Sequence, residues 1–410
     1  MRIKSLTITN YRSCVKTTFS PHEQLSVLIG PNGSGKTNVL SALRLLPALC
    51  FTSPRHYESD EPIASASELR IVYQVGDHEV IYVANLALVT NEKNLDEITR
   101  AHEEWWIPSL NGRRRKIGVA SSFLFELMQE RPTSSTWSSA RRRAHFVDWL
   151  NDRQLIPTAL SVLEEIIQFA TRISYYSASQ FTNPGSAPVS FEVESEAKRR
   201  VGISLTGHKR LLFDIYQAHR ANSDTYTEFI SLVGPDGIGL VDSIDFEEIK
   251  TSSSNYSVMT GGKVVKRERT NLLVVPRVMI AGNVLSPSQL SEGTFKTLAL
   301  VFCLVTDKST LLMIEEPEVC VHYGLLSSIV ELIKIYSDQK QILVSTHSDS
   351  VLDKIDVENV FGVNRDRELG TSVSNIKKRM RGQELAALRH YLENEGSLGE
   401  YWKHGDLEQA

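Results

Sequence analysis

The sequence predicts an α/β fold in which a mostly parallel sheet is interrupted by a mainly helical insertion. Short apolar runs recur at residues 25–29, 271–275, 311–314 and 341–344, each about the length of a buried strand. Helical periodicity follows several of these runs, and such alternation is typical of parallel sheets with covered faces. Residues 91–270 have a different character, with helical patterns separated by Ser/Thr-rich and Pro/Gly-rich joints.

Composition excludes several classes of protein. The 410 residues are 41% hydrophobic and 23% charged, with a net charge of -4, which excludes a strongly basic nucleic-acid coat. The cysteines show neither CxxC pairing nor dense spacing, which disfavours a zinc ribbon or a disulfide framework. No apolar run is long enough to span a membrane and the N-terminus lacks a signal-peptide pattern. We therefore expect a cytoplasmic protein.

The N-terminal part predicts a strand, a glycine loop and a helix in succession. The apolar run 25–29 stops at a glycine, as a buried strand entering a loop would. Residues 38–46 then show helical periodicity that ends at Pro47. Residues 69–90 read as two strands joined by a tight turn.

The remaining chain predicts helices at about 120–130, 140–172, 208–232, 292–306 and 323–337. A short amphipathic helix beginning near residue 380 is expected to dock on the rest of the protein. We expect an N-terminal lobe at 1–90, a mainly helical insertion or arm at 91–270, a C-terminal lobe at 271–375 and a helical tail at 376–410.

The most informative motif is Gly30–Thr37, which fits G-x-x-x-x-G-K-[ST] and lies between the expected strand and helix. Backbone N–H groups of such a loop wrap phosphates, the lysine reaches the β and γ phosphates, and the hydroxyl binds Mg²⁺. A chance glycine turn is the alternative, which the strand and helix on either side disfavour. The expected nucleotide contacts are Gly30, Pro31, Asn32, Gly33, Ser34, Gly35, Lys36, Thr37 and Asn38.

Two acids end the apolar run 311–314. A carboxylate at a strand tip can hold Mg²⁺, and a neighbouring one can polarise the attacking water, so we assign these roles to Glu315 and Glu316. Alone, the run is equally well explained as a buried strand that meets a solvated helix start. The phosphate loop upstream favours the nucleotide interpretation.

Two further elements fit the same site. His347 ends another apolar strand, where it would face the γ-phosphate and donate a hydrogen bond, with Lys36 and Glu316 completing the catalytic set. Ser291, Glu292 and Gly293 open the helix 292–306, whose N-terminus offers a second anion site. A lone histidine is more often an ordinary surface residue, and a helix cap by Ser291 is far commoner than a phosphate site.

The order and spacing of these motifs resemble the ATPase heads of the ABC superfamily, specifically the RecF/SMC/OLD-like branch. The correspondence gives Walker A at 30–37, the signature at 290–294, Walker B at 311–316 and a switch residue at His347. The N-terminal Ile-Lys-Ser-Leu-Thr-Ile-Thr-Asn-Tyr-Arg-Ser looks like the opening strand and turn of that branch, which implies that Arg12 lies near the adenine or the phosphates.

This resemblance implies an ABC-type ATPase head with ATP and Mg²⁺ as ligands. In the family the signature of one subunit completes the nucleotide site of the other, which implies a homodimer or a higher assembly around ATP. Gln180 is our candidate for the metal-contacting Q-loop glutamine. Glu292 and Glu315 depart from the commonest residues, Gly and Asp, but Glu-Glu-Pro-Glu at 315–318 is frequent in OLD-like and phage-defence ATPases.

The expected function is a slow ATPase that acts as sensor or scaffold for a separate effector, a nuclease or toxin, in prokaryotic anti-phage defence. The residues after His347 are too few for a fused Toprim-type nuclease domain. Two alternatives stay open, a RecF-like DNA repair ATPase and a nucleotide-stabilised scaffold with negligible turnover. The basic runs Arg113–Arg115 and Arg141–Arg143 are candidates for nucleic-acid contact, although a solvated face or an acidic partner explains them equally well.

Overall fold

The structure is a computed structural model. It describes residues 1–50, 67–90, 96–128, 139–194, 207–258, 264–319, 321, 323–380 and 382–403. The chain divides into two compact units. Unit 1 comprises Met1–Tyr176, Lys308–Pro317 and Val330–Ala410, and unit 2 comprises Ser177–Asp307 and Glu318–Ile329.

Unit 1 contains a mostly parallel sheet that includes three of the four predicted strands. The fourth run, 271–275, lies instead in an antiparallel sheet of unit 2. Its strand order is β16 (Gly370–Asn375), β15 (Val360–Asp366), β3 (Leu25–Ile29), β14 (Gln341–Thr346), β13 (Leu311–Glu315) and β8 (Ile173–Ser177). β3 pairs in parallel with β14 and β15, β14 pairs in parallel with β13, and β16 is antiparallel to β15. Every residue of β3 and β14 is buried, as expected of parallel strands that are covered on both faces.

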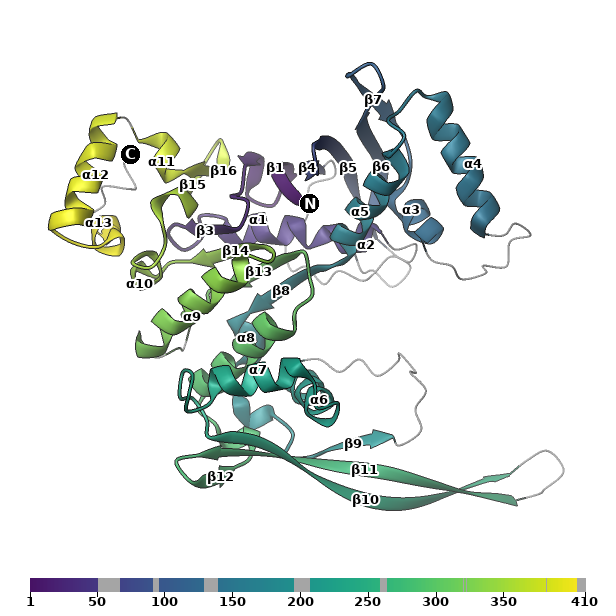
Figure 1. The fold of residues 1–410 in the computed structure, drawn as a ribbon, viewed down its shortest axis with the longest axis vertical. Helices are drawn as coiled ribbons and strands as arrows, with labels where there is room; N and C mark the ends of the chain where they lie inside the picture. The colour runs from purple at the N-terminus through teal and green to yellow at the C-terminus, as the bar shows by residue number, and fades with distance from the viewer. Residues whose placement is uncertain are drawn as a thin grey trace. The chain divides into compact units, whose positions relative to one another are not determined.

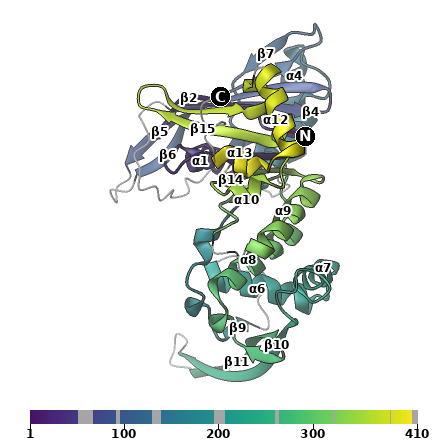
Figure 2. The same cartoon turned by 90° about the vertical axis from the view of Figure 1, so that its left-hand side faces the viewer.

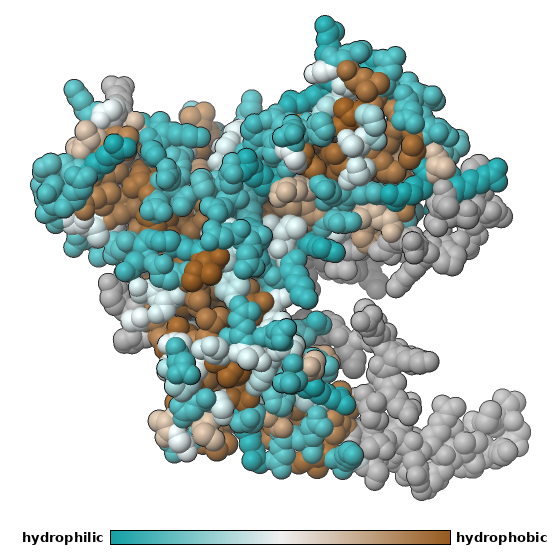
Figure 3. Space-filling view, viewed as in Figure 1, coloured by the Kyte–Doolittle hydropathy of each residue, from teal (hydrophilic) through white to brown (hydrophobic). Residues whose placement is uncertain are grey.

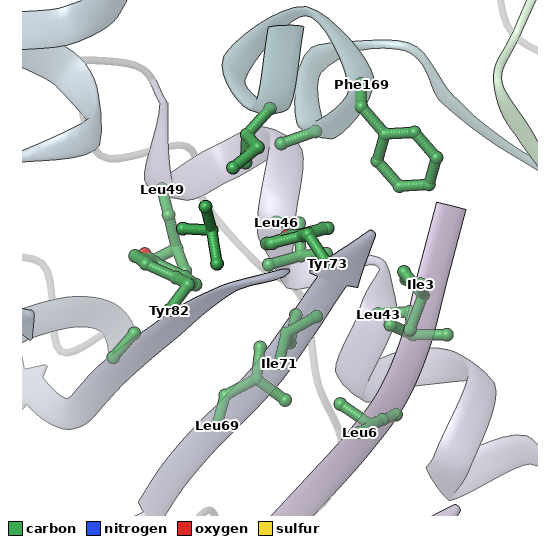
Figure 4. Close-up of a cluster of buried hydrophobic side chains, with 14 of the residues drawn as sticks. Ile3, Leu6, Leu43, Leu46, Leu49, Leu69, Ile71, Tyr73, Tyr82 and Phe169 are labelled. Atoms are coloured by element: carbon green, nitrogen blue, oxygen red, sulfur yellow. The ribbon is translucent and has the colours of Figure 1, made fainter. Parts of the chain in front are cut away.

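A second, antiparallel sheet in unit 1 packs on helices. Its order is β2 (Cys14–Phe19), β1 (Arg2–Tyr11), β4 (Ser67–Val75), β5 (His78–Thr90), β6 (Asp96–Pro108) and β7 (Arg114–Ile117). Alternate residues of β4 are buried, as expected of a strand with one face in the core. Figure 4 shows Tyr73 and Tyr82 of this sheet among Leu46, Leu49 and Phe169 from helices. The helices in this part of the chain are α1 (Lys36–Leu43), α2 (Leu45–Leu49), α3 (Ser121–Met128), α4 (Ser139–Asp152) and α5 (Ala159–Thr171). Leu46 and Leu49 lie in α2 and Phe169 lies in α5.

Unit 2 combines helices with a long β-hairpin (Figure 1). Strands β10 (Ser243–Val258) and β11 (Val264–Ile280) form the hairpin, and β11 also pairs with β9 (Phe191–Glu194) and β12 (Asn283–Leu285). The helical elements are η1 (Ala178–Phe181), η2 (Pro184–Ser186), α6 (Gly207–Arg220), α7 (Asp224–Val233), η3 (Pro287–Gln289) and α8 (Glu292–Thr306). Phe229 and Phe302, with ring centroids 5.1 Å apart, pack α7 on α8.

The end of unit 1 docks on the element that follows β14. α13 (Leu398–Lys403) lies beside α10 (Asp349–Leu352) (Figure 2). The backbone N–H of Gly399 donates to Asp353 Oδ1 at 2.9 Å, and Lys403 pairs with Asp349. Burial alone raises the pKa of Asp349, but the hydrogen bond and charge of Lys403 hold that pKa below its usual range. The amphipathic helix expected near residue 380 corresponds instead to α12 (Gly382–Asn394), in which Leu388 is buried, and the docking of that helix stays a prediction. The other helical elements that follow β13 are α9 (Tyr323–Ser337), η4 (Val357–Asn359), α11 (Ile376–Arg379) and α12 (Gly382–Asn394).

Most of the predicted elements are confirmed. α8 and α9 have the predicted bounds, and β4 and β5 form the predicted hairpin with Val75 opposite His78. The predicted helix 38–46 is instead divided at Arg44 into α1 and α2. Pro47 lies in the first turn of α2, where its missing N–H costs no intrahelical bond. Of the helices in the described ranges, none combines the length and apolar character needed to cross a bilayer.

The segment 91–270 differs from the expected helical arm. It contains helices α3 to α7, but also strands, and residues up to Tyr176 group with unit 1. β6 was missed because one inward position is an acid: Glu103 is buried and accepts hydrogen bonds from Tyr82 and Ser121. A charged residue on the core face conceals the period-2 pattern that identifies a strand. The polar β10 offers no such pattern either.

Gln341 is one of the residues that connect the two sheets of unit 1. Gln341, at the start of β14, is 3% exposed. Its Oε1 accepts from the Ile3 backbone N–H at 3.0 Å, and its Nε2 donates to the carbonyl oxygens of Ile3 at 3.1 Å and His22 at 2.9 Å. The side chain therefore supplies the hydrogen bonds that these backbone groups need in the interior.

We predict that Gln341→Leu lowers the free energy of unfolding by about 3 kcal/mol, because buried polar groups are left unpaired. Urea titration of the full chain measures the change. Gln24→Leu is the matched control: Gln24 hydrogen-bonds Asp338 at 2.8 Å on the surface. Its effect should stay within about 0.5 kcal/mol. Equal effects of the two variants would contradict the bridging role of Gln341.

Candidate nucleotide site

Parallel strand pairing brings three of the predicted motifs to one edge of the sheet in unit 1. Ile29, the last residue of β3, is the register partner of Thr346, and Glu315 is the partner of Ser345. The phosphate loop, the paired acids and His347 each follow one of these neighbouring strands. Because parallel strands present their carboxyl ends on the same side, the side chains that follow them converge.

The phosphate loop requires its glycines. Gly35 has a φ of 104°, a left-handed conformation that glycine adopts without steric cost. A Cβ at Gly35 would lie 2.1 Å from Thr371 Oγ1, and one at Gly30 would lie 2.2 Å from the Val363 carbonyl oxygen. The loop thus approaches β15 and β16 too closely for any side chain at these positions.

Lys36 and Ser34 face the inside of the loop. Lys36 is 6% exposed, and its Nζ donates to the carbonyl oxygens of Gly30 at 2.7 Å and Pro31 at 3.2 Å. The Ser34 Oγ is buried without a hydrogen-bond partner among the described residues. A buried cation, an unsatisfied hydroxyl and the N-terminus of α1 together form a site that fits a phosphate group.

The groups expected to hold Mg²⁺ contact each other. The Thr37 hydroxyl donates a hydrogen bond to Glu315 Oε1. The other carboxylate oxygen, Oε2, accepts from the hydroxyl of Tyr175 in β8, and the guanidinium of Arg44 lies over the Tyr175 ring at 4.0 Å. An oxygen-only pair of hydroxyl and carboxylate beside a phosphate loop fits the ligand preference of Mg²⁺.

Glu316 is held in an unusual backbone conformation. Its φ is 48°, rare for a side chain of this kind, and its N–H donates to the Ser345 carbonyl oxygen at 2.8 Å. His347 Nδ1 lies 3.6 Å from Glu316 Oε1, and both side chains are partly exposed. The strained backbone turns Glu316 away from the line of β13 and toward the end of β14.

A chain of hydroxyl and amide groups supports the phosphate loop. Asn38 Nδ2 donates to Ser13 Oγ at 2.7 Å, and Ser13 Oγ lies 2.8 Å from Thr371 Oγ1. Thr371 Oγ1 also reaches the Ser34 carbonyl oxygen at 3.0 Å. Arg12 Nη1 donates to Asn38 Oδ1 at 3.4 Å, so Arg12 lies beside the loop as expected. Its contact with ATP stays a prediction.

Sequence reasoning missed two of these residues. Thr371 is 337 positions from Ser34, so no local pattern connects it to the loop. Tyr175 offered a weak signal, because it lies in a strand-like run shortly before Gln180. Both residues act through others: Thr371 positions the phosphate loop, and Tyr175 positions Glu315.

The remaining candidates lie in unit 2. Ser291 caps α8, where its Oγ accepts from the Thr294 backbone N–H at 3.1 Å, and Lys296 Nζ pairs with Glu292 at 2.6 Å. The cap interpretation is thus confirmed, and the contact of Ser291, Glu292 and Gly293 with nucleotide stays a prediction. Gln180 is exposed in η1, and its metal contact also stays a prediction.

Comparison of the sequence with models of protein families identifies the family of this chain. A family model described as "AAA domain, putative AbiEii toxin, Type IV TA system" matches residues 25–353. This chain belongs to that family. The match includes the phosphate loop, the acids that end β13, and His347. The predicted relationship to AAA-family and RecF-like ATPases is confirmed.

Curated relatives of this AAA domain chain are RecF proteins. DNA replication and repair protein RecF of Desulforamulus reducens is 42% identical over 155 residues, 36% of each protein. RecF of Chlorobium luteolum is 49% identical over 43 residues, 10% of this chain and 12% of that protein. The chain therefore spans only about a tenth to a third of the length of the curated relatives it matches.

Solved structures of SMC heads match most of the chain at low identity. The SmcHead bound to the C-winged helix domain of ScpA is 17% identical, with 91% of this chain and 97% of that chain covered and a TM-score of 0.47. The SMC head domain from Thermotoga maritima is 13% identical, with 92% and 99% covered and a TM-score of 0.43.

We predict that Tyr175→Phe raises the Mg²⁺ concentration needed for tight nucleotide binding about 10-fold or more, because a carboxylate ligand loses its positioning partner. Titration of a fluorescent ATP analogue at varied Mg²⁺ measures the shift. Tyr226→Phe is the matched control, since the Tyr226 hydroxyl donates to the Ile244 carbonyl oxygen in unit 2. An unchanged Mg²⁺ requirement in Tyr175→Phe would remove Tyr175 from the site.

Proposed function

We propose that this chain binds and slowly hydrolyses ATP, dimerises around it, and acts as the sensor or scaffold of a separate effector in prokaryotic anti-phage defence. The observation that carries the proposal is the contact between the phosphate-loop hydroxyl of Thr37 and the Walker B carboxylate of Glu315. Membership of the AAA domain family supports the ATPase part.

Residues of this chain supply binding and orientation. Lys36, now held by two loop carbonyls, carries the positive charge that a β,γ-phosphate group needs. Thr37 and Glu315 would hold Mg²⁺, and Tyr175 fixes the carboxylate rotamer. When bound, the metal ion neutralises charge that develops on the phosphate oxygens.

Glu316 is the proposed general base. Its carboxylate is partly exposed, so it can accept a proton from a water molecule. His347, at 3.6 Å from that carboxylate, orients it and donates a hydrogen bond toward the γ-phosphate position. Both side chains leave the same sheet edge as the phosphate loop, which supports a role at the same bound phosphate group.

Ser291 is the residue we propose to act in the partner subunit's site. It is exposed at the N-terminus of α8, a helix of 15 residues, where hydroxyl and helix dipole favour an anion. If ATP is held between two heads, its γ-phosphate bridges them. Hydrolysis then removes a charge around which the interface is built, and the assembly loosens.

The defence role is supported by the family description, which names an AbiEii toxin and a type IV TA system, and by the Glu-Glu-Pro-Glu run at 315–318. A toxin–antitoxin context implies two gene products, one of which restrains or triggers the other. This chain would supply the nucleotide-controlled member. Its effector, a nuclease or toxin, would be a separate protein.

We predict that Glu316→Gln retains ATP binding, lowers kcat about 10²–10⁴-fold and accumulates an ATP-dependent dimer or larger assembly. Lys36→Ala should weaken ATP binding at least about 10-fold and stay dissociated, because a charged phosphate contact is lost. Light scattering with and without ATP, beside phosphate release, separates these results. Glu331→Gln, an exposed change on α9, is the matched control. Hydrolysis at the normal rate in Glu316→Gln would refute its assignment as general base.

A RecF-like repair ATPase is the second candidate, favoured by the 155-residue match to RecF of Desulforamulus reducens. It predicts that duplex or gapped DNA stimulates hydrolysis by the purified chain without a partner. Charge reversal at Arg113 and Arg141 together should then abolish the stimulation and flatten its dependence on salt. Steady-state phosphate release over a salt series tests this. DNA-independent hydrolysis at every salt concentration would favour the defence role.

A further inference from the structure

Ser345 carries a buried hydroxyl group close to the nucleotide site. It lies in β14 and is 1% exposed, and its Oγ has no hydrogen-bond partner among the residues that the structure describes. On the face of the protein drawn in Figure 3, hydrophilic side chains cover much of the surface, where water can pair with polar groups. A hydroxyl in the interior needs a partner within the protein or on a ligand.

Strand pairing places Ser345 between the carboxylate proposed to hold Mg²⁺ and the strand that leads into the phosphate loop. Its register partner on β13 is Glu315, and its register partner on β3 is Leu28, two residues before Gly30. Residues opposite each other on adjacent parallel strands point to the same face of the sheet. Ser345 and Glu315 therefore share a face.

That face is the one covered by α1. The Glu315 carboxylate accepts a hydrogen bond from Thr37, the second residue of α1. Leu343, two residues before Ser345 and on the same side of β14, belongs to one hydrophobic core with Val39 of α1. The Ser345 hydroxyl therefore lies on the α1 side of the sheet, one strand from Glu315.

Another buried serine in the same sheet has a partner. Ser26 of β3 is 0% exposed, and its Oγ accepts a hydrogen bond from the His22 backbone N–H at 2.7 Å. Leaving a buried hydroxyl unpaired costs free energy, so Ser345 destabilises the ligand-free protein relative to alanine. Local costs of this kind are common where residues serve a ligand. The hydroxyl of Ser34 in the phosphate loop is likewise buried without a partner in the described ranges.

We propose that the Ser345 hydroxyl hydrogen-bonds the water shell of the Mg²⁺ ion that binds with ATP, and so helps to position that ion. Mg²⁺ dehydrates reluctantly and keeps several water molecules beside one or two carboxylates, so a hydroxyl next to Glu315 has a chemically suitable partner. Groups of this kind orient a metal site without binding the ion directly. The inference rests on the proposed ATPase function and deepens it, because it assigns a further positioning residue to the same site.

Replacement of Ser345 by alanine separates a role toward the ligand from a structural role. Ser345→Ala should leave the urea midpoint of the nucleotide-free chain unchanged or raise it, because no hydrogen bond is lost. It should weaken binding of a fluorescent, non-hydrolysable ATP analogue about 10-fold in the presence of Mg²⁺. The weaker binding in EDTA should not change. Equilibrium fluorescence titration of the full chain measures both affinities.

Ser26→Ala is the matched control, since it removes a buried hydroxyl that has a partner. This variant should lower the urea midpoint, because the His22 N–H loses its acceptor. Its affinity for the analogue in Mg²⁺ should equal that of the native chain. The two serine variants thus have opposite expected effects on stability and on metal-dependent binding.

Three outcomes would overturn the proposal. Equal affinity of the native chain and Ser345→Ala for the analogue in Mg²⁺ removes the hydroxyl from the site. A loss of the same size in EDTA assigns the hydroxyl to the nucleotide rather than to the metal ion. A lower urea midpoint in Ser345→Ala shows that the hydroxyl has a structural partner. A native chain that binds no adenine nucleotide refutes the proposed function as well, which distinguishes that failure from one confined to Ser345.

Discussion

The parallel register of β3, β14 and β13 is the constraint on which the site depends. It places Ile29 opposite Thr346 and Glu315 opposite Ser345, so loops distant in sequence leave the sheet at one edge. Local backbone features then complete the site. The glycines allow the phosphate loop to approach β15 and β16, and the positive φ of Glu316 turns its carboxylate toward His347. A shift of one strand by one residue would separate these features, because it would turn that strand's side chains to the other face of the sheet.

The features predicted from sequence were those that a local pattern specifies. The phosphate loop, the acids after β13 and the bounds of α8 follow from spacing and periodicity, which require no knowledge of tertiary contacts. What remained hidden depends on long-range packing. Gln341 joins two sheets, Thr371 supports a loop 337 positions away, and Glu103 occupies a core position that periodicity assigns to an apolar residue. Polar residues with buried structural roles are the common element among these failures.

The division into two units has a consequence for function. Thr37, Glu315 and Glu316, which we propose to hold Mg²⁺ and to activate water, lie in unit 1, whereas Ser291 and Gln180 lie in unit 2. Our proposal that Ser291 serves a partner's site makes ATP a bridge between subunits, so that binding energy is converted into assembly and not only into turnover.

Mixing two inactive variants tests the shared site most directly. Lys36→Ala disables the phosphate loop, and Ser291→Arg blocks the cap of α8. If each site combines one subunit's loop with the other's cap, a mixed dimer retains one intact site. An equimolar mixture should recover roughly a quarter of native ATP hydrolysis, since about half the dimers are mixed and each has one working site of two. A mixture that stays inactive, or full activity in Ser291→Arg alone, would contradict the account.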